Sequence, residues 1–243
     1  RGVRMVKRPA PGGEGPMLNS FSPEAMEFYL KRFDSVFAKY SGKLPRAQYH
    51  DSYEYSGNWS PDLYPQFKKR RGYALEDNLS FLFEEQTENL TDKHKRIKYD
   101  YRRTLAELHL EYIQTWSAWS ASRGMLTRNQ AHGSPANLLD VYAAADIPEI
   151  EMFGSPQFPI PGFRHEDPFV RKGDNNPIVM KMASSAAHIM KPEGRQWVTS
   201  ESFTWLRENW HGSLAQMKLS ADLFFLAGVN HMFYHGNCYS PPD

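Results

Sequence analysis

Glutamates at the ends of predicted strands are the residues of this sequence best suited to chemistry. Glu54 lies in the segment DSYEYSGNW, where its polar and aromatic neighbours are Asp51, Tyr53, Tyr55 and Trp59. Aromatic neighbours remove water from a carboxyl group, which raises its pKa and suits it to act as a general acid. The alternative interpretation is a glutamate that pairs with a lysine or an arginine at the end of a strand.

Glu201 occupies a segment, VTSESFTW, that is rich in small hydroxyl side chains. Hydroxyl groups donate hydrogen bonds to a carboxylate and thereby favour its charged form. The pattern therefore predicts that Glu201 acts as a base or a nucleophile, and pattern alone makes it the best catalytic candidate. A hydrogen-bonded structural glutamate is the alternative.

Glu149 and Glu151 occupy alternate positions of IPEIEMFG, so a strand places both side chains on one face. Two neighbouring carboxylates repel each other unless a cation or a shared proton holds them together. Calcium is the cation that this pair suggests, because it prefers oxygen ligands. The alternative is that one glutamate of the pair faces an arginine, such as Arg128.

Amide, imidazole and other polar side chains near the same strand ends are candidate contacts to a polar substrate. With Asp51 and Trp59 beside Glu54, the predicted substrate contacts are Asn129, His132, His231 and His235. The histidines lack the helical spacing of a zinc site, and a lone histidine is more often a structural hydrogen bonder. The sequence has no GxSxG elbow, phosphate-binding loop or dinucleotide fingerprint, which counts against esterases, kinases and dehydrogenases.

Six short segments with the pattern of strands position these residues. They are 3–9, 46–54, 125–133, 147–154, 196–203 and 230–236. Helical stretches separate most of them, and alternating strands and helices predict a parallel sheet. In a parallel barrel the carboxyl ends of all strands open on one face, where the active site lies. The sequence therefore predicts an α/β fold, a (β/α)8-type barrel or a large part of one, with the polar strand ends at one pocket.

Helix boundaries are marked by capping residues and glycines. Ser22 precedes a proline at the start of an apolar helical repeat, and a long helix from about residue 91 to 123 ends before Gly124. Ser134 is expected to cap the helix ANLLDVYAA, and Asn176 the helix IVMKMASSAAHIM. A last helix is predicted between Gly212 and Gly228.

Composition limits the partners of the chain. The 29 basic and 28 acidic residues nearly balance, so no nucleic-acid partner is expected, and no run approaches the length of a membrane span. The single cysteine excludes an internal disulfide framework. The 243 residues begin and end in strand-like segments. We therefore expect one catalytic barrel domain over residues 1–243 that is truncated at both ends and belongs to a longer enzyme.

The chain resembles the α-L-rhamnosidases of glycoside hydrolase family 106. The resemblance lies in GGEGP, RAQYHDSYEYSGNWSPDLYPQFKKRRGY, RNQAHGSPANLLDVYAAADIPEIEMFG, KMASSAAHI, VTSESFTWL and LSADLFFLAGVNHMFYHG. It implies a (β/α) barrel, an inverting mechanism with paired glutamates as acid and base, and a calcium ion that helps to bind sugar hydroxyls. By motif, Glu54 in DSYE, Glu151 in IPEIE and Glu201 in SESF match the positions at which the resemblance implies the acid, the base and the calcium ligand.

The residues and the resemblance together predict a bacterial glycoside hydrolase that removes terminal α-L-rhamnose from plant or microbial glycans. Glycosidic cleavage needs a protonated carboxyl and an ionised carboxylate, for which Glu54 and Glu201 are the candidates, with Glu151 orienting substrate directly or through a cation. We expect a periplasmic or extracellular location, and β domains of the longer protein packed against the barrel. The competing hypotheses are a non-catalytic carbohydrate-binding barrel, another barrel glycosidase such as a galactosidase-like enzyme, and a metal-dependent hydrolase of other substrates.

Overall fold

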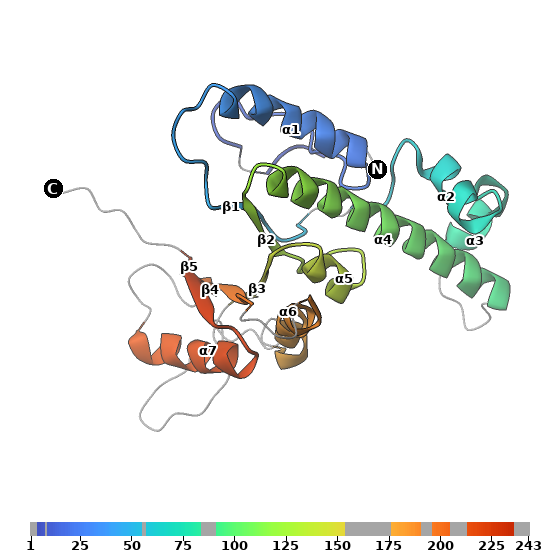
Figure 1. Ribbon diagram of the computed structural model, residues 1–243. Coiled ribbons are helices and arrows are strands. Elements are labelled where there is room, and N and C mark those ends of the chain that lie inside the picture. The colour runs from blue at the N-terminus through green and yellow to red at the C-terminus, as the bar shows by residue number, and fades with distance from the viewer. Residues whose placement is uncertain are drawn as a thin grey trace. The chain divides into compact units, whose positions relative to one another are not determined.

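The computed structural model of the chain describes residues 4–7, 9–54, 57–83, 91–153, 176–190, 196–204 and 213–235. The chain forms two compact units (Figure 1). The first unit contains Arg1–Pro45 and Tyr55–Arg123, and the second contains Arg46–Glu54 and Gly124–Asp243. All helices before residue 124 therefore belong to the first unit, and the whole sheet belongs to the second.

The first unit is helical. Its elements are α1 (Pro23–Phe37), α2 (Leu63–Arg71), the 3-10 helix η1 (Glu76–Asn78), α3 (Leu79–Phe83) and α4 (Asp92–Ala121). The predicted start of α1 is confirmed, because the Ser22 hydroxyl accepts a hydrogen bond from the backbone N–H of Ala25 at 3.1 Å. No helix among the described residues is long and apolar enough to cross a membrane.

Helix α4 is the element on which the rest of the first unit packs. Leu108 and Ile113 on its apolar face are fully buried. At its end the Trp119 ring lies 6.4 Å from the ring of Phe33 and 5.9 Å from that of Phe37, both on α1. The burial of these large side chains, rather than helix propensity, holds α1 against α4.

The second unit contains a five-stranded parallel sheet in the order β1-β2-β3-β4-β5. Its strands are β1 (Ala47–His50), β2 (Leu126–Gln130), β3 (Ile147–Phe153), β4 (Thr199–Thr204) and β5 (His231–Tyr234). Five of the six predicted strands are therefore confirmed.

The strand predicted over residues 3–9 is wrong in its described part. There Met5 forms only an isolated antiparallel bridge to Pro16, within the first unit. The turn residues between the two positions bring the chain back on itself, so no crossover returns this segment to the parallel sheet.

The sheet curls into a half-barrel, which is part of the predicted barrel. The Tyr49 hydroxyl on β1 lies 3.2 Å from a carboxyl oxygen of Glu201 on β4. The Arg128 guanidinium on β2 lies 3.7 Å from the ring centre of Phe233 on β5. In a flat sheet, side chains on the first and fourth strands would be about 14 Å apart, at roughly 4.8 Å for each strand spacing. The curl therefore makes the face with Tyr49 and Glu201 concave.

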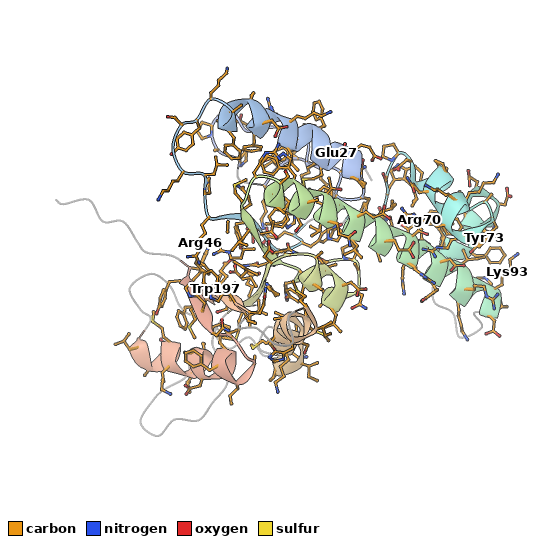
Figure 2. All side chains as sticks on the ribbon, in the orientation of Figure 1. Glu27, Arg46, Arg70, Tyr73, Lys93 and Trp197 are labelled. Carbon is orange, nitrogen blue, oxygen red and sulfur yellow. The ribbon has the colours of Figure 1, made fainter. Side chains whose placement is uncertain are left out.

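Exposed side chains contact one another at the amino-terminal end of the half-barrel. The Arg46 guanidinium, just before β1, lies 4.1 Å from the ring centre of Trp197, just before β4, and Figure 2 shows the two residues side by side. The Trp197 ring is stacked on the His231 ring at 5.9 Å. This cation–π and aromatic packing links the starts of β1, β4 and β5.

Three helices accompany the strands of the second unit. They are α5 (Leu138–Ala143), α6 (Pro177–Met190) and α7 (Leu214–Leu226). Helices α5 and α6 pack on β3, and α7 packs on β4. Ile150 and Met152 alternate with the two β3 glutamates and are buried in the apolar core of the unit. On β3 the outer face is therefore apolar, and the concave face carries the two glutamates.

Candidate active site

Four carboxyl groups gather at the carboxyl ends of β1, β3 and β4, and we call them the acidic cluster. Glu151 on β3 and Glu201 on β4 are register partners, and Asp51 and Glu54 follow β1. Adjacent strands lie about 4.8 Å apart, so the first two carboxyls are close neighbours on the concave face. The negative charges of all three other members act on Glu151. The structure thus brings the three predicted catalytic glutamates to one mouth of the sheet.

Glu151 is the member of the cluster whose protonation is most strongly perturbed. Burial, together with the negative charges of Glu201, Asp51 and Glu54, raises its pKa to about 8, against a hydrogen bond from Ser52. Its side chain is buried, and its Oε2 has no hydrogen-bond partner among the described residues. A carboxyl in this environment holds its proton at neutral pH.

Glu54 is exposed, so the burial expected from its aromatic neighbours is not found. Tyr53 is only half-buried, and Tyr55 lies outside the described residues. Trp59 belongs to the first unit. Proximity in sequence to aromatic residues therefore did not predict desolvation at this carboxyl.

Glu201 accepts hydrogen bonds on both carboxyl oxygens. Its Oε2 accepts from the Gln130 amide at 2.8 Å and from the Tyr49 hydroxyl at 3.2 Å. Its Oε1 accepts from the Thr204 hydroxyl at 3.1 Å and lies 3.7 Å from Nε2 of His235. Donors therefore come from three different strands and fix the orientation of this carboxylate.

Only one of the small hydroxyls predicted around Glu201 is a partner. Thr204 donates to it, whereas the hydroxyls of Ser200 and Ser202 hydrogen-bond to each other. Ser200 and Ser202 alternate with Glu201 along β4, and they therefore point to the opposite face of the sheet.

Glu149 forms a buried ion pair with Arg128, as the alternative interpretation of the sequence held. The Arg128 Nε lies 3.1 Å from Oε2 of Glu149, at an angle outside hydrogen-bond geometry. Thr199 donates to the same oxygen at 2.6 Å, and the Gln130 amide donates to Oε1 at 3.1 Å. Burial raises the pKa of Glu149 against these partners. Both carboxyl oxygens are engaged within the protein, which does not fit the predicted role of a calcium ligand.

Two aromatic rings hold the Arg128 side chain in place. Its guanidinium lies 4.2 Å from the ring centre of Tyr49 and 3.7 Å from that of Phe233. Burial and the negative charges of Glu149, Asp51 and Glu201 strongly raise the pKa of Tyr49. Tyr49 therefore keeps its proton, and its hydroxyl lies 3.2 Å from both Asp51 and Glu201.

The structure separates the predicted amide and imidazole contacts. His235 lies beside Glu201, whereas His231 is at the start of β5 on Trp197. Asn129 is buried on the opposite face from the cluster, where its amide donates to the carbonyl of Val141. The reason is the period of two in a strand, which turns Asn129 away from the side of Arg128 and Gln130.

His132 lies in the turn after β2. Its backbone carbonyl accepts a hydrogen bond from the N–H of Tyr53 at 2.9 Å. A β-carbon at the next residue, Gly133, would lie 2.9 Å from the Tyr53 carbonyl oxygen, and Gly133 has φ of 75°. The two loops after β1 and β2 are therefore in direct backbone contact, which supports the position of Asp51 and Ser52.

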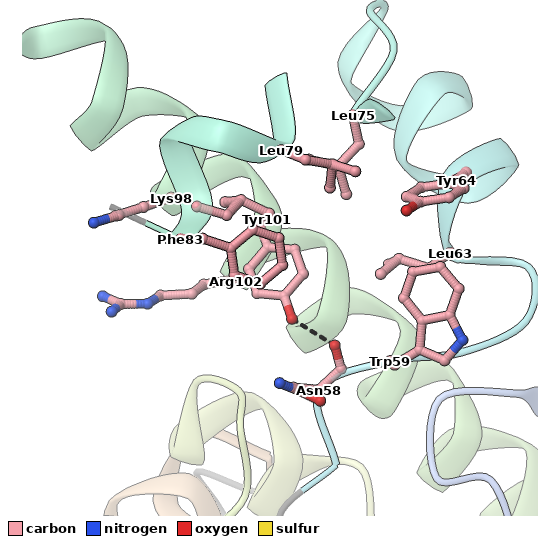
Figure 3. A pocket seen from close by; sticks show the side chains of 11 residues that line it. Asn58, Trp59, Leu63, Tyr64, Leu75, Leu79, Phe83, Lys98, Tyr101 and Arg102 are labelled. Atoms are coloured by element: carbon pink, nitrogen blue, oxygen red, sulfur yellow. Dashed lines mark hydrogen bonds between the residues drawn. The ribbon is translucent and has the colours of Figure 1, made fainter. Parts of the chain in front are cut away.

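Trp59 lines a cavity of about 500 Å³ in the first unit (Figure 3). Leucines form much of the wall, and Lys98 and Arg102 lie at one side. The Tyr101 hydroxyl donates to the carbonyl of Asn58 at 2.5 Å. All residues that line this cavity, Trp59 included, belong to the first unit, whereas the acidic cluster belongs to the second.

Gln130 and Tyr49 are the site residues that sequence reasoning missed. Both belong to predicted strands, and both share a face with residues that were considered: Tyr49 with Asp51, and Gln130 with Arg128. The alternation of side chains along each strand was therefore the signal that could have identified these two residues. Their partners on β3 and β4 depend on register, which a single sequence does not provide.

Comparisons with known proteins identify the relatives of the chain. The sequence model of a family described as alpha-L-rhamnosidase matches residues 7–243. A search among curated proteins finds no match. Among solved structures, a rhamnosidase from Novosphingobium sp. PP1Y matches with a TM-score of 0.77 and 25% identity, over 99% of this chain and 23% of that one.

A second structural match shows the fold alone. It is a beta-galactosidase from the Antarctic haloarchaeon Halorubrum lacusprofundi, with a TM-score of 0.57 and 13% identity. It covers 96% of this chain and 39% of the other. The chain thus spans well under half the length of either matched structure.

Proposed function

The chain belongs to the glycoside hydrolase family 106 α-L-rhamnosidases, and from that premise we propose that it carries the acid and base of a rhamnoside hydrolase. The observation that supports this most directly is the acidic cluster on the concave face of a parallel half-barrel. Hydrolysis of a glycosidic bond uses two carboxyl groups that face opposite sides of the sugar ring. The expected substrate is a terminal α-L-rhamnose of a plant or microbial glycan.

We assign Glu54 as the acid and Glu201 as the base. An inverting enzyme needs its two carboxyl groups roughly 6.5–9.5 Å apart, so that a water molecule fits between the base and the sugar. Glu151 and Glu201 lie on adjacent strands, whose spacing of about 4.8 Å is short for that purpose. Glu54 follows β1 and Glu201 lies on β4, and these two strands do not pair with each other. We therefore propose an inverting reaction, in which Glu201 takes a proton from water while Glu54 protonates the leaving oxygen.

A calcium ion at the cluster is part of the proposal, with Glu151 rather than Glu149 as its ligand. Glu151 has a buried oxygen without a partner among the described residues and three acidic neighbours, whereas both oxygens of Glu149 are engaged. The described residues contain no group of three His, Cys, Asp or Glu side chains arranged to hold a metal, so substrate hydroxyls and water complete the proposed ligand set. Bound calcium supplies coordination of the sugar hydroxyls.

Hydrolysis of 4-nitrophenyl α-L-rhamnoside by the full-length protein tests the proposed reaction. Glu54→Gln and Glu201→Gln should each lower kcat by about 10²–10⁴-fold, the usual contribution of general acid–base catalysis. Proton NMR of the first product should show the anomeric configuration opposite to that of the substrate. Retained configuration would make one of these glutamates a nucleophile. Binding of rhamnosides without turnover would indicate a non-catalytic carbohydrate-binding barrel instead.

Calcium dependence has a separate test with a matched pair of variants. Exhaustive chelation should lower turnover, and calcium should restore it. In titration calorimetry, Glu151→Gln should weaken calcium binding by at least about tenfold, since it removes a carboxyl group that would bind calcium in its ionised form. Glu149→Gln should leave calcium affinity unchanged within about twofold. If only Glu149→Gln lowered the calcium affinity, Glu149 rather than Glu151 would be the ligand.

The location in the cell is also a proposal. We expect the full-length protein in the periplasm or outside the cell, where it would encounter its glycan substrates. Fractionation of cells that express it, followed by immunoblotting, checks this. Recovery with the cytoplasmic fraction would contradict it.

A further inference from the structure

Gln130 joins two carboxyl groups that have different surroundings. Its Nε2 donates to Oε1 of Glu149 at 3.1 Å and to Oε2 of Glu201 at 2.8 Å. The side chain is 1% exposed, so water does not compete for these bonds. An amide nitrogen has two protons, one for each acceptor. Gln130 is therefore a fixed link between β3 and β4 across the concave face.

The orientation of this amide follows from its neighbours. The reversed orientation would place the carbonyl oxygen of Gln130 against two carboxyl oxygens, where it accepts nothing and is repelled. In the observed orientation that Oε1 is buried without a hydrogen-bond partner among the described residues. This orientation leaves the amide oxygen unsatisfied while it directs both N–H groups at the carboxyls.

The other end of the link is anchored by the ion pair of Glu149. Arg128 lies 3.1 Å from Glu149 and is held between the rings of Tyr49 and Phe233. Thr199 donates to Glu149 as well. Glu149 is fully buried, so neither it nor Gln130 has room to change rotamer without breaking several contacts.

We propose that Gln130 is a positioning residue, whose amide carries the restraint of the Arg128–Glu149 ion pair to the Glu201 carboxylate. This inference rests on the proposed role of Glu201 as the base. Gln130 does not touch the substrate. It holds Oε2 of Glu201, so that the carboxylate keeps one orientation while it takes a proton from the attacking water. Glu149 thereby acquires a function that is distinct from binding a metal.

The first test replaces Gln130 with a side chain of similar size that donates no hydrogen bond. Gln130→Met in the full-length protein should lower kcat on 4-nitrophenyl α-L-rhamnoside by about 10–100-fold, the effect of misplacing a reacting group by about 1 Å. KM should stay within about twofold, because substrate contacts are unchanged. Gln48→Met is the matched control. Gln48 lies on β1, on the opposite face from Tyr49, and its amide donates to Sδ of Met125 at 3.2 Å. It should leave kcat within about twofold.

A second variant tests the anchor and covers the case in which Gln130→Met does not fold. Glu149→Gln keeps the shape of the side chain but removes the charge that Arg128 holds. It should lower kcat without raising KM. Its effect should be smaller in the Gln130→Met background than in the wild type, because the two residues act through one link. Multiplicative losses, a loss confined to KM, or an equal loss in Gln48→Met would overturn the inference.

Crystal structures test the orientation of the Glu201 carboxylate without depending on activity. The Glu201 carboxylate should occupy one orientation in the wild type and more than one in Gln130→Met or Glu149→Gln. If all forms fail to hydrolyse rhamnosides, the proposed function is wrong, and this comparison alone decides whether Gln130 positions Glu201. An unchanged Glu201 in both variants would refute the positioning role even in an active enzyme.

Discussion

The surroundings of each carboxyl group decide what it does, although the side chains are chemically identical. Glu149 is held by Arg128 and Thr199, and Glu201 accepts bonds from three strands. Glu151 has a buried oxygen without a partner among the described residues. These three environments suit the proposed roles of a positioning anchor, a base and a cation ligand, respectively.

The raised pKa of Glu151 predicts that the stability of the metal-free protein depends on pH. Its pKa is about 8 in the folded state, against an ordinary value of about 4.3 in the unfolded chain. The folded state therefore binds this proton more tightly, and the free energy of unfolding falls as the pH rises from about 4 to about 8. Glu151→Gln has no such titration. The free energy of unfolding of Glu151→Gln, relative to that of the wild type, should therefore rise by on the order of 1–3 kcal/mol between pH 5 and pH 9.

Urea unfolding with a chelator at the two pH values measures this difference. Glu27→Gln on the exposed surface of α1 is the control, and its stability relative to the wild type should not change with pH. A constant difference between Glu151→Gln and the wild type would show that Glu151 titrates alike in both states.

Sequence reasoning found the acidic residues but not the groups that organise them. Glu149 and Glu151 were correctly placed on one face, and Arg128 was correctly named as a possible partner. The expectation of a buried Glu54 was wrong. Gln130 was missed, since its importance depends on two partners 19 and 71 residues away in the chain. Burial and long-range pairing come from the fold, whereas alternation within a strand can be read locally.

At the scale of elements, two glycines that end helices allow a matched comparison. Gly124 follows α4 with φ of 71°, and Gly228 follows α7 with φ of 92°. A β-carbon at Gly124 would meet nothing within 4 Å, but at Gly228 it would lie 2.8 Å from Cβ of Ser184 on α6. The hydroxyl of Ser184 also donates to the carbonyl of Ala227 at 2.7 Å. The C-terminal end of α7 therefore packs closely against α6.

Substitution by alanine should separate backbone strain from steric conflict. Gly124→Ala should destabilise the protein by about 1 kcal/mol, the cost of a left-handed conformation for a residue with a β-carbon. Gly228→Ala should cost about 2–4 kcal/mol, because α6 and α7 must also move apart. Thermal unfolding followed by circular dichroism measures both. Equal losses would show that the contact with Ser184 relaxes freely.

Most elements were predicted, but their exact starts were less certain. The five strands and the long helix α4 agree with the patterns in the sequence. Helix α5 begins later than expected, because Asn137 accepts the capping hydrogen bond from Leu139, while Ser134 lies in a turn. Serine and asparagine are both good capping residues, and propensity alone does not choose between them.

At the scale of the whole molecule, two units with separate cores should unfold in two steps. Leu108 is fully buried in the first unit and Ile150 in the second. Leu108→Ala and Ile150→Ala should each remove about 2–5 kcal/mol from the unit that contains the residue. Scanning calorimetry should therefore show that each variant lowers a different transition. One transition that both variants shift equally would indicate a single cooperative domain.

The sequence predicted a barrel over the whole chain, but the sheet occupies only the second unit. The helix after Ser22 was predicted from its apolar periodicity, and the helix over about residues 91–123 was predicted as well. Periodicity shows that a helix has an apolar face, but it does not show which other element covers that face. The packing of α1 on α4 within a separate unit was therefore beyond local reasoning.

The long connection from β1 to β2 has a consequence for the order of assembly. Ala47 pairs with Leu126, roughly 80 residues later in the chain, and closing so long a loop is entropically costly and slow. Arg128 and Ile147 are separated by only about 20 residues, so β2 and β3 can associate much sooner. During synthesis, β1 leaves the ribosome long before its partner exists. We therefore expect β1 to join the sheet late, and with it Tyr49 and Asp51, so that the acidic cluster is completed only at a late stage of folding.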